Sequence, residues 1–415
     1  MNQTEICSQP ENSFWISTND TIVDDGRTRV IIELPSFDKG GMEKVVLDSV
    51  LAFKKSKYSI LVVTQGSIGY LGTIAAKHNI SIMQLPTIGM EYAYGRLIKK
   101  FRPHLSMSHF SFSGYPLFQE HGIPNITFIH NVYAFLGLEK KDLFMKSDVA
   151  VTHYIAVSKN AADYITKNFF INPEKITIIP NGISISEHEN RHKNIVPAKR
   201  ETFGLKENDY VFLNPASYNL HKGHYLMTDA MTTILKTHNN IKILCVGNPV
   251  NSAHLTKLKD HIKHNGLEKH ILMPGYVEHI ENIMVICDAV LMPSFIEGWS
   301  IAMNEAMFYE KPLILTDTGG ASEVIKENDI GILLPNEYGK SETLDSKTLD
   351  KLSYFPHRYR TSGELVRAMI NFAENREFWK KRGALGREKI YQSYSFTSVV
   401  NSYECIMDKY SKPNQ

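Results

Sequence analysis

The sequence carries almost no net charge. Its 46 lysines and arginines nearly balance its 44 aspartates and glutamates, so the 415-residue chain has a formal net charge of +2 at pH 7. A protein that grips a nucleic-acid backbone needs a positive surface that neutralises phosphates. The balanced composition provides no such field, and we therefore do not expect nucleic acid among the partners.

Cysteine is also scarce. The four cysteines, Cys7, Cys245, Cys287 and Cys405, lie far apart and form neither a CxxC pair nor the Cys/His spacing of a zinc site. No DxD motif, which could hold a divalent ion, lies in a suitable loop. We predict reduced, mostly buried thiols in a cytoplasmic protein that has no metal site.

Long apolar runs are missing as well. No stretch approaches the roughly 18 apolar residues that a membrane span requires. The N-terminus, MNQTEICSQPENSFWISTNDTIVDDG, is polar and acidic, without the basic start and apolar core of a secretory signal. We therefore expect a soluble, cytoplasmic protein, which leaves open an association with the inner face of the cytoplasmic membrane.

The apolar residues that are present come in short runs separated by helical patterns. In the first half these runs are RVIIELP (29–35), YSILVVT (58–64), NISIMQLP (79–86), PHLSMSHF (103–110), ITFIHN (126–131), YIAVSK (154–159) and ITIIPN (176–181). The runs are uniformly apolar and do not alternate, which is typical of strands buried on both faces of a parallel sheet. Strand and helix repeated in this way predict a doubly wound α/β domain.

The same rhythm appears a second time after a break. Residues 184–208 are charged and contain a proline, which indicates a linker. The second set of runs is DYVFLNPAS (209–217), IKILCVGN (241–248), HILMPGY (270–276), DAVLMPSF (288–295), KPLILTD (311–317) and GILLP (331–335). A chain of this length favours two domains at about 150 residues or more each. We predict two Rossmann-like halves facing a cleft, the usual ligand site of such folds.

The predicted boundaries follow from this rhythm. We assign an N-terminal extension to residues 1–28, a first Rossmann-like domain to 29–190, a second to 191–385, and a C-terminal helix that packs back on the first domain to 386–415. Residues 337–361 are polar and irregular, and we predict an inserted loop there.

One stretch of the second half, SFIEGWSIAMNEAMFYEKP, holds two glutamates eight positions apart. The pattern predicts a strand up to Phe295, a turn at Glu297, and a helix that Ser300 caps and Pro312 stops. Glu297 would then lie at the carboxyl end of a strand, beside helix N–H groups that can bind a diphosphate. Glu305 would lie on the helix, where its carboxylate can accept hydrogen bonds from ribose hydroxyls. The alternative is a plain turn glutamate and a solvated helix glutamate.

The residues around this stretch favour the first of these interpretations. The segment from Pro293 to Ile325, PSFxEGWSxxxxEAMxxxKPxIxTDxGGxxEVI, closely resembles the E-x7-E signature of the retaining, nucleotide-sugar-dependent glycosyltransferases of family 4, which have the two-Rossmann GT-B fold. The resemblance implies that Glu297 contacts the donor sugar as a catalytic residue and that Glu305 binds the ribose. It also implies that backbone N–H groups around the turn bind the donor diphosphate, namely those of Gly298, Trp299 and Ser300.

Four further segments agree with this family in order and spacing. Gly40 and Gly41 follow the first strand and are similar to the family's glycine loop, which contacts the diphosphate; alone they would indicate an ordinary turn. His130 ends a strand where the family has a histidine near the donor sugar, although a lone histidine there is more often structural. Lys222, before Gly223, matches the family's diphosphate-binding lysine; the alternative is an exposed surface lysine. Asn181-Gly182 is similar to the family's asparagine–glycine turn, and we assign it a structural role.

One position departs from the family pattern. Family members usually have an arginine five residues before the lysine–glycine pair, and here Ser217 occupies that position. The loss removes a bidentate donor, whose charged hydrogen bonds are worth roughly 1.5 to 3 kcal/mol. Either another cation substitutes, or donor binding depends more on the helix N-terminus. The resemblance covers about residues 29–335 and, more loosely, the C-terminal helices.

The resemblance implies transfer of a sugar from a nucleotide-diphosphate donor to an acceptor hydroxyl with retention of configuration, without a metal ion or other cofactor. A glycan or lipid-linked acceptor of the cell envelope agrees with the family. Two other classes stay open: a non-catalytic partner subunit, favoured by Ser217, and a GT-B sugar-nucleotide epimerase. Basic clusters in YGRLIKKFRP and FKKSKY of the first half are either solvated helix faces or contacts to anionic lipid headgroups.

Overall fold

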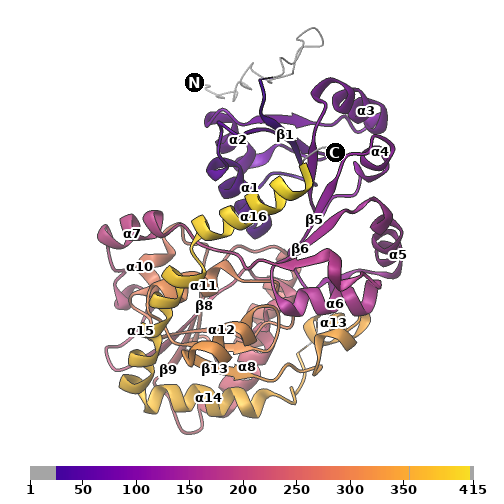
Figure 1. Cartoon of the computed structure of the whole chain (residues 1–415). Coiled ribbons are helices and arrows are strands. Elements are labelled where there is room, and N and C mark those ends of the chain that lie inside the picture. The colour runs from indigo at the N-terminus through magenta and orange to yellow at the C-terminus, as the bar shows by residue number, and fades with distance from the viewer. Residues whose placement is uncertain (1–24, 355, 412–415) are drawn as a thin grey trace, which may run out of the picture. The chain divides into compact units, whose positions relative to one another are not determined.

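The computed structural model describes residues 25–354 and 356–411, and its first sheet is built from the first set of apolar runs (Figure 1). The strand order is β3-β2-β1-β4-β5-β6-β7. The strands are β1 (Thr28–Leu34), β2 (Tyr58–Thr64), β3 (Ser81–Gln84), β4 (Leu105–His109), β5 (Asn125–Ile129), β6 (His153–Ala156) and β7 (Ile176–Ile178). The pairs of β1 with β2 and β4, of β2 with β3, of β4 with β5 and of β6 with β7 are parallel.

The second sheet has the order β10-β9-β8-β11-β12-β13. Its strands are β8 (Tyr210–Pro215), β9 (Ile241–Val246), β10 (Ile271–Gly275), β11 (Ala289–Met292), β12 (Leu313–Thr316) and β13 (Gly331–Leu334). All five neighbouring pairs are parallel. The strand order reverses between β8 and β11, and open α/β sheets bind ligands at the carboxyl ends of strands at such a point. The two sheets confirm the predicted pair of Rossmann-like halves.

Helices connect these strands. Those before β8 are α1 (Gly41–Ala52), α2 (Gly69–Lys77), α3 (Met90–Phe101), α4 (Tyr115–Glu120), η1 (Tyr133–Phe135), α5 (Leu138–Ser147), η2 (Asp148–Ala150), α6 (Lys159–Phe169), η3 (Pro173–Lys175), α7 (Ile185–Lys193) and η4 (Arg200–Phe203). Those after β8 are η5 (Leu220–Lys222), α8 (His224–Ile234), α9 (Ser252–His264), α10 (Ile280–Met284), α11 (Ile301–Phe308), α12 (Ala321–Asn328), η6 (Ser341–Thr343), α13 (Ser346–Tyr354), α14 (Ser362–Glu374), α15 (Arg376–Ser393) and α16 (Phe396–Ser411). Among the described residues, no helix is long and apolar enough to cross a membrane.

By packing, the chain divides into two units. Of the described residues, the first contains those up to Phe128, Val149–Thr152 and those from Glu404 to Ser411; the second contains Ile129–Asp148 and His153–Tyr403. In the first unit the end of α16 forms ion pairs with the segment between α1 and β2. Lys54 pairs with Glu404 at 3.0 Å and Lys57 with Asp408 at 2.5 Å. The domain boundaries predicted from the sequence stay a prediction.

Two segments differ from their expected structure. Residues 184–208, expected to be a linker, contain α7, because Ser184 caps the helix and Glu187 pairs with Arg191 one turn later at 2.5 Å. The expected loop at 337–361 contains η6 and α13. Glu337 anchors its far end by accepting hydrogen bonds from the Arg360 and Thr361 N–H groups at 2.8 and 2.9 Å.

The described cysteines follow the expectation in part. Cys245 and Cys287 are free and buried, whereas Cys405 is free and exposed. Burial raises the pKa of both buried thiols to about 12, so they stay protonated and inert near pH 7. Cys7 lies outside the described residues.

Candidate functional site

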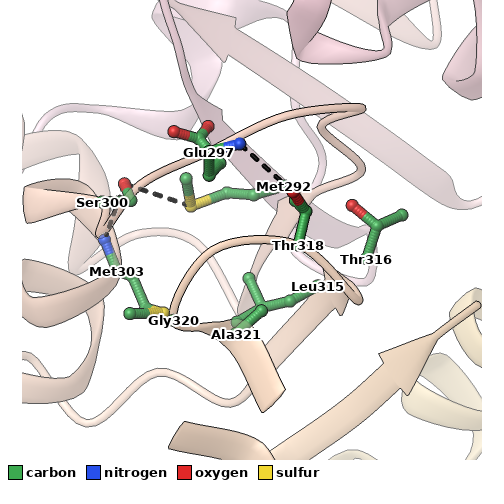
Figure 2. A pocket seen from close by; sticks show the side chains of 9 residues that line it. All are labelled: Met292, Glu297, Ser300, Met303, Leu315, Thr316, Thr318, Gly320 and Ala321. Carbon is green, nitrogen blue, oxygen red and sulfur yellow. Dashed lines mark hydrogen bonds between the residues drawn. The ribbon is translucent and has the colours of Figure 1, made fainter. Parts of the chain in front are cut away.

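The turn that carries Glu297 lies between β11 and α11, as the sequence predicts. Ser300 has extended backbone angles and its side-chain oxygen accepts the Met303 N–H at 3.4 Å, so it caps α11. Figure 2 shows this bond and the Glu297 N–H directed at Thr318 Oγ1, at 3.3 Å. Below the turn, a small cavity is lined by apolar side chains, including those of Met303 and Leu315, and by polar ones, including that of Thr316.

The Glu297 carboxylate lies beside the predicted diphosphate-binding lysine. Lys222 Nζ is 2.5 Å from Glu297 Oε1, and the Ser294 hydroxyl donates to the same oxygen at 2.8 Å. The side chains of Lys222 and Glu297 are 23% and 15% exposed, so the pair is accessible without being fully solvated. The structure thus brings together two candidate residues from separate strand ends of one sheet.

The loop of Lys222 is fixed by close backbone contacts. Gly223 has a φ of 71°, and a Cβ there would lie 2.0 Å from the Pro293 carbonyl oxygen, so only glycine can occupy this position. The Phe295 N–H donates to the His221 carbonyl at 2.8 Å. Because both contacts join the lysine loop to the segment after β11, Lys222 and Glu297 are held by one backbone frame.

His221 lies next to Lys222 and was not among the residues predicted for the site. Burial, followed by the charge of Lys222, lowers the pKa of His221 to about 4. The imidazole is therefore neutral at pH 7 and supplies no charge in place of the arginine that Ser217 replaces. The sequence has a histidine directly before Lys222 and Gly223, but no local pattern indicates that its ring is buried.

His130 follows β5 and is joined to the Glu297 turn through its backbone. Asn131 and Gly298 form an antiparallel bridge, and a Cβ on Gly298 would lie 1.8 Å from the His130 carbonyl oxygen. Burial lowers the pKa of His130 to about 4, so its side chain is neutral at pH 7. The structure therefore brings His130 to the Glu297 turn, and Gly298 is required for that approach.

The side chain of Trp299 is buried in the core of the second unit, so only its backbone can face a ligand at this turn. The family-like motif also includes Glu323, to which the resemblance assigns no role. Its carboxylate accepts the Lys159 N–H at the start of α6 at 2.8 Å, which assigns it a structural contact.

Glu305 is the fifth residue of α11 and is partly buried. Burial raises the pKa of Tyr309 to about 12, and the carboxylates of Glu281 and Glu305 contribute to the shift. Although burial opposes it, the carboxylates of Glu187, Glu281 and Glu305 hold the pKa of Arg191 above its usual value. Glu305 therefore lies within electrostatic range of Arg191, a neighbour that no motif indicated.

Gly40 and Gly41 belong to the first unit, at the start of α1. Both are exposed. A Cβ on Gly40 would lie 2.1 Å from Glu43 Oε2, whereas nothing lies within 4 Å of one on Gly41. Burial raises the pKa of Glu43, and the charge of Asp38 adds to the shift. Because Glu43 Oε2 ends a flexible side chain that can move aside, sterics require neither glycine, and ligand contact at either position stays a prediction.

Comparison with known proteins agrees with the motifs. Residues 39–187 match the family model "Glycosyltransferase Family 4" and residues 196–352 match "Glycosyl transferases group 1". The chain is 24% identical over 231 residues to an Escherichia coli UDP-Gal:alpha-D-GlcNAc-diphosphoundecaprenol alpha-1,3-galactosyltransferase, covering 51% of this chain and 57% of that protein. It is 27% identical over 214 residues to an N-acetylgalactosaminyltransferase of Campylobacter jejuni that acts on a diphospho-undecaprenol substrate, covering 51% and 53%. The chain thus spans little more than half the length of these curated relatives.

Solved structures show the same fold. Anabaena HepE in complex with UDP and glucose has a TM-score of 0.74 and 16% identity, covering 92% of this chain and 100% of that one. A glycosyltransferase from Rickettsia africae has a TM-score of 0.73 and 18% identity, covering 94% and 100%. At these identities the likeness concerns the fold alone, and it confirms the predicted GT-B arrangement of two Rossmann-like domains.

Proposed function

We propose that this chain, which carries glycosyltransferase family 4 and group 1 domains, transfers a hexosyl group from a nucleotide-diphosphate sugar to an acceptor hydroxyl with retention of anomeric configuration. The observation that carries the proposal is the Lys222–Glu297 pair at the carboxyl ends of β8 and β11, beside the capped N-terminus of α11. A cation and a helix N-terminus suit a diphosphate. A neighbouring carboxylate suits the hydroxyls and the positive anomeric carbon of a sugar.

Each residue then has a separate task. Lys222 and the N–H groups of the turn stabilise the negative charge that builds on the diphosphate as the glycosidic bond breaks. Glu297 stabilises positive charge on the sugar, and Glu305 holds the ribose. His130 is neutral at pH 7, which suits hydrogen bonding to a sugar hydroxyl rather than charge stabilisation. The acceptor hydroxyl attacks on the face from which the diphosphate leaves, and a phosphate oxygen takes its proton.

Donor binding requires Lys222 to exchange partners. Its ammonium group lies 2.5 Å from the Glu297 carboxylate, so a diphosphate that binds Lys222 competes with this carboxylate. This exchange leaves Glu297 free to accept hydrogen bonds from the sugar. The pair thus keeps both groups compensated until the substrate supplies their partners.

The donor and acceptor follow from the relatives by analogy. A UDP-sugar is the first donor to test, because HepE was solved with UDP and glucose and the E. coli relative is named for UDP-Gal. A lipid-linked glycan of the cell envelope is the first acceptor class, because both enzymes named above act on diphospho-undecaprenol substrates. No metal ion is proposed, and activity should therefore persist in EDTA.

The test is product analysis with purified protein, UDP-sugars and a diphosphoprenyl-linked glycan acceptor. We expect an acceptor heavier by one hexose, formed at the same rate with and without EDTA, with the anomeric proton coupling of the donor. An inverted coupling would remove the retaining mechanism while leaving the transferase. A donor sugar altered without acceptor would instead indicate the epimerase.

The alternative as a partner subunit rests on Ser217. A thermal-shift panel of UDP, GDP, ADP and their sugars addresses it, because a ligand at 100 times its dissociation constant adds about 2.7 kcal/mol of apparent stability. A shift by one nucleotide that Glu305→Ala removes would support a donor site. No shift at millimolar concentration would favour the partner subunit.

A further inference from the structure

The backbone of the Glu297 turn is held by three segments at three successive carbonyl groups. The Glu297 carbonyl accepts from the Val132 N–H at 3.4 Å, and the Gly298 carbonyl accepts from the Gly320 N–H at 2.8 Å. The Trp299 carbonyl accepts from the Asn181 side-chain amide at 3.0 Å. Two of these donors are backbone groups, and the third belongs to a side chain that a substitution can remove.

Asn181 is part of a closed ring of hydrogen bonds. The Asn181 side-chain amide donates to the Trp299 carbonyl. Trp299 Nε1 donates to Asn304 Oδ1 at 3.0 Å, and Asn304 Nδ2 donates to the Asn181 carbonyl at 2.7 Å. Each residue donates once and accepts once, and all three are at most 6% exposed. The ring joins the segment after β7, the turn and the body of α11.

The segment that carries Asn181 is itself fixed. Ile183 donates its N–H to the Tyr394 carbonyl at 3.1 Å and accepts the Phe396 N–H at 2.8 Å. A Cβ on Gly182 would lie 2.9 Å from the backbone N and Cα of Phe396. The Trp299 ring packs on Tyr394 with a centroid separation of 4.9 Å. Asn181 therefore holds the turn against an anchored backbone rather than against a mobile loop.

We propose that Asn181 is a positioning residue for sugar transfer, which sets the Glu297 turn through the Trp299 carbonyl. This inference rests on the proposed function. It extends that function to Asn181, for which the sequence predicted only a structural role in the Asn181-Gly182 turn. Glu297 lies two residues before the tethered carbonyl, and in this backbone geometry its carboxylate lies 2.5 Å from Lys222 Nζ. Misplacing a reacting group by about 1 Å can cost about 100-fold in rate.

A matched control exists in the same unit. Asn214 of β8 is fully buried, donates its side-chain amide to the Leu291 carbonyl at 2.8 Å, and has a buried Oδ1 without a partner among the described residues. Asn181 has the same bond type and an equally unpartnered Oδ1. Alanine at either position removes one buried amide-to-carbonyl bond, so the two variants should lose similar stability.

The experiment compares Asn181→Ala and Asn214→Ala with the wild type. We expect kcat of Asn181→Ala to fall about 100-fold, with KM for the UDP-sugar and Kd for UDP within about threefold, and Asn214→Ala to keep kcat within about threefold. Hydrogen exchange of the peptide 294–303 should accelerate in Asn181→Ala only. The exchange readout needs no turnover, so it decides the positioning claim even if the wild type transfers no sugar.

Two results would overturn the inference. If both variants lower kcat and melting temperature equally and leave exchange at 294–303 alike, Asn181 only stabilises the fold. If Asn181→Ala weakens UDP binding as much as turnover, the ring supports the nucleotide site generally. A wild type without turnover on any donor, but with exchange altered only in Asn181→Ala, would reject the proposed function and keep the tether.

Discussion

A buried carboxyl of the first unit and three histidines of the second have pKa values shifted in opposite directions. In the first, Glu33 of β1 is 1% exposed and accepts hydrogen bonds from the Ser108 hydroxyl at 2.9 Å, the Tyr94 hydroxyl at 3.0 Å and the Gly114 N–H at 3.1 Å. Burial raises its pKa to about 7. In the second unit, burial lowers the pKa of His130 and His221 to about 4 and that of His224 to about 3.

The difference gives the units opposite responses to pH. A carboxyl with a raised pKa stabilises the fold fully below its unfolded value, and that stability is lost as pH rises through the folded value. A histidine with a lowered pKa stabilises the fold above its unfolded value, and that stability is lost as pH falls. The stability contributed by Glu33 should therefore be lost between pH 4.5 and about 7, and that contributed by the three histidines should be lost as the pH falls below 6.5, the ordinary histidine value.

The largest expected effect comes from changing the Lys222–Glu297 pair of the second unit, to which we assign a part in sugar transfer. We expect Glu297→Gln to lower kcat by at least about 100-fold, as losing one transition-state electrostatic contact does. UDP should bind no more weakly, because Lys222 loses its competing partner. The partly exposed pair should contribute at most about 1 kcal/mol to stability. Kinetics, UDP titration and melting of the same preparation check all three.

Lys222→Met is the companion of that variant. It removes the cation that we propose for the diphosphate, so UDP binding should weaken together with turnover. If Glu297→Gln kept wild-type turnover, the carboxylate would have no part in transfer. The pair would then be a structural ion pair.

The next largest effect is the pH dependence of stability that Glu33 gives the first unit. Glu33→Gln keeps an acceptor for Tyr94 and the Gly114 N–H, and its amide can donate to Ser108, whose hydroxyl already lies 3.0 Å from Asn125 Oδ1. The shift from 4.5 to about 7 corresponds to about 3 kcal/mol between pH 4.5 and 8 at about 1.4 kcal/mol per unit. Urea unfolding across this range should show that slope in the wild type and not in Glu33→Gln.

The other titratable groups around Glu33 do not change charge there. Burial raises the pKa of Tyr94 and of Tyr115 far above 7, so both stay neutral. Glu33→Leu is the contrasting variant, because it leaves the same donors without an acceptor and should be destabilising at every pH. An unchanged pH slope in Glu33→Gln would show that other carboxyls carry it.

A smaller effect is the pH dependence of stability that His224 gives the second unit. His224 is buried, and its hydrogen bond with the Asn219 backbone only partly offsets the effect of burial. Burial lowers its pKa from 6.5 to about 3, with His254 and Lys222 adding to the shift. At pH 5 the cost of keeping it neutral is about 2 kcal/mol. His224→Phe should therefore gain stability over the wild type at pH 5 and not at pH 8, as measured by urea unfolding.

The sequence predicted the sheets better than the contacts that make the site. Uniformly apolar runs such as that of β1 indicate a two-sided buried strand, and the glycine, proline and serine of the Glu297 turn indicate its local form. Helix α7 was missed because its residues are polar, and its cap and ion pair outweigh that composition. The Lys222–Glu297 pair and the Asn181 tether join distant segments, which no local pattern encodes.

The smallest effect tests the surfaces of the units. The sequence contains two basic clusters, and in the structure Lys54 and Lys57 of one are paired with carboxylates of α16. The other lies on α3, where Arg96 and Lys99 are exposed on the helix that Ile88 precedes, with an exposed fraction of 91% for Ile88. An apolar and basic surface of this kind favours anionic lipid at about 1 kcal/mol per charge.

We therefore expect the protein to co-sediment with phosphatidylglycerol vesicles at low salt and to be released at high salt. Replacing Arg96 and Lys99 by glutamate should abolish the binding, because it reverses the attraction at the membrane surface. Replacing the exposed Lys257 and Lys259 of α9 by glutamate makes the same change of charge in the second unit and should leave binding intact. Equal loss in both double variants would mean that net charge, rather than α3, governs the association. If the protein still bound vesicles after Arg96 and Lys99 were replaced by glutamate, α3 would be an ordinary solvated helix face. The protein would then bind a lipid-linked acceptor without using α3 as a membrane contact.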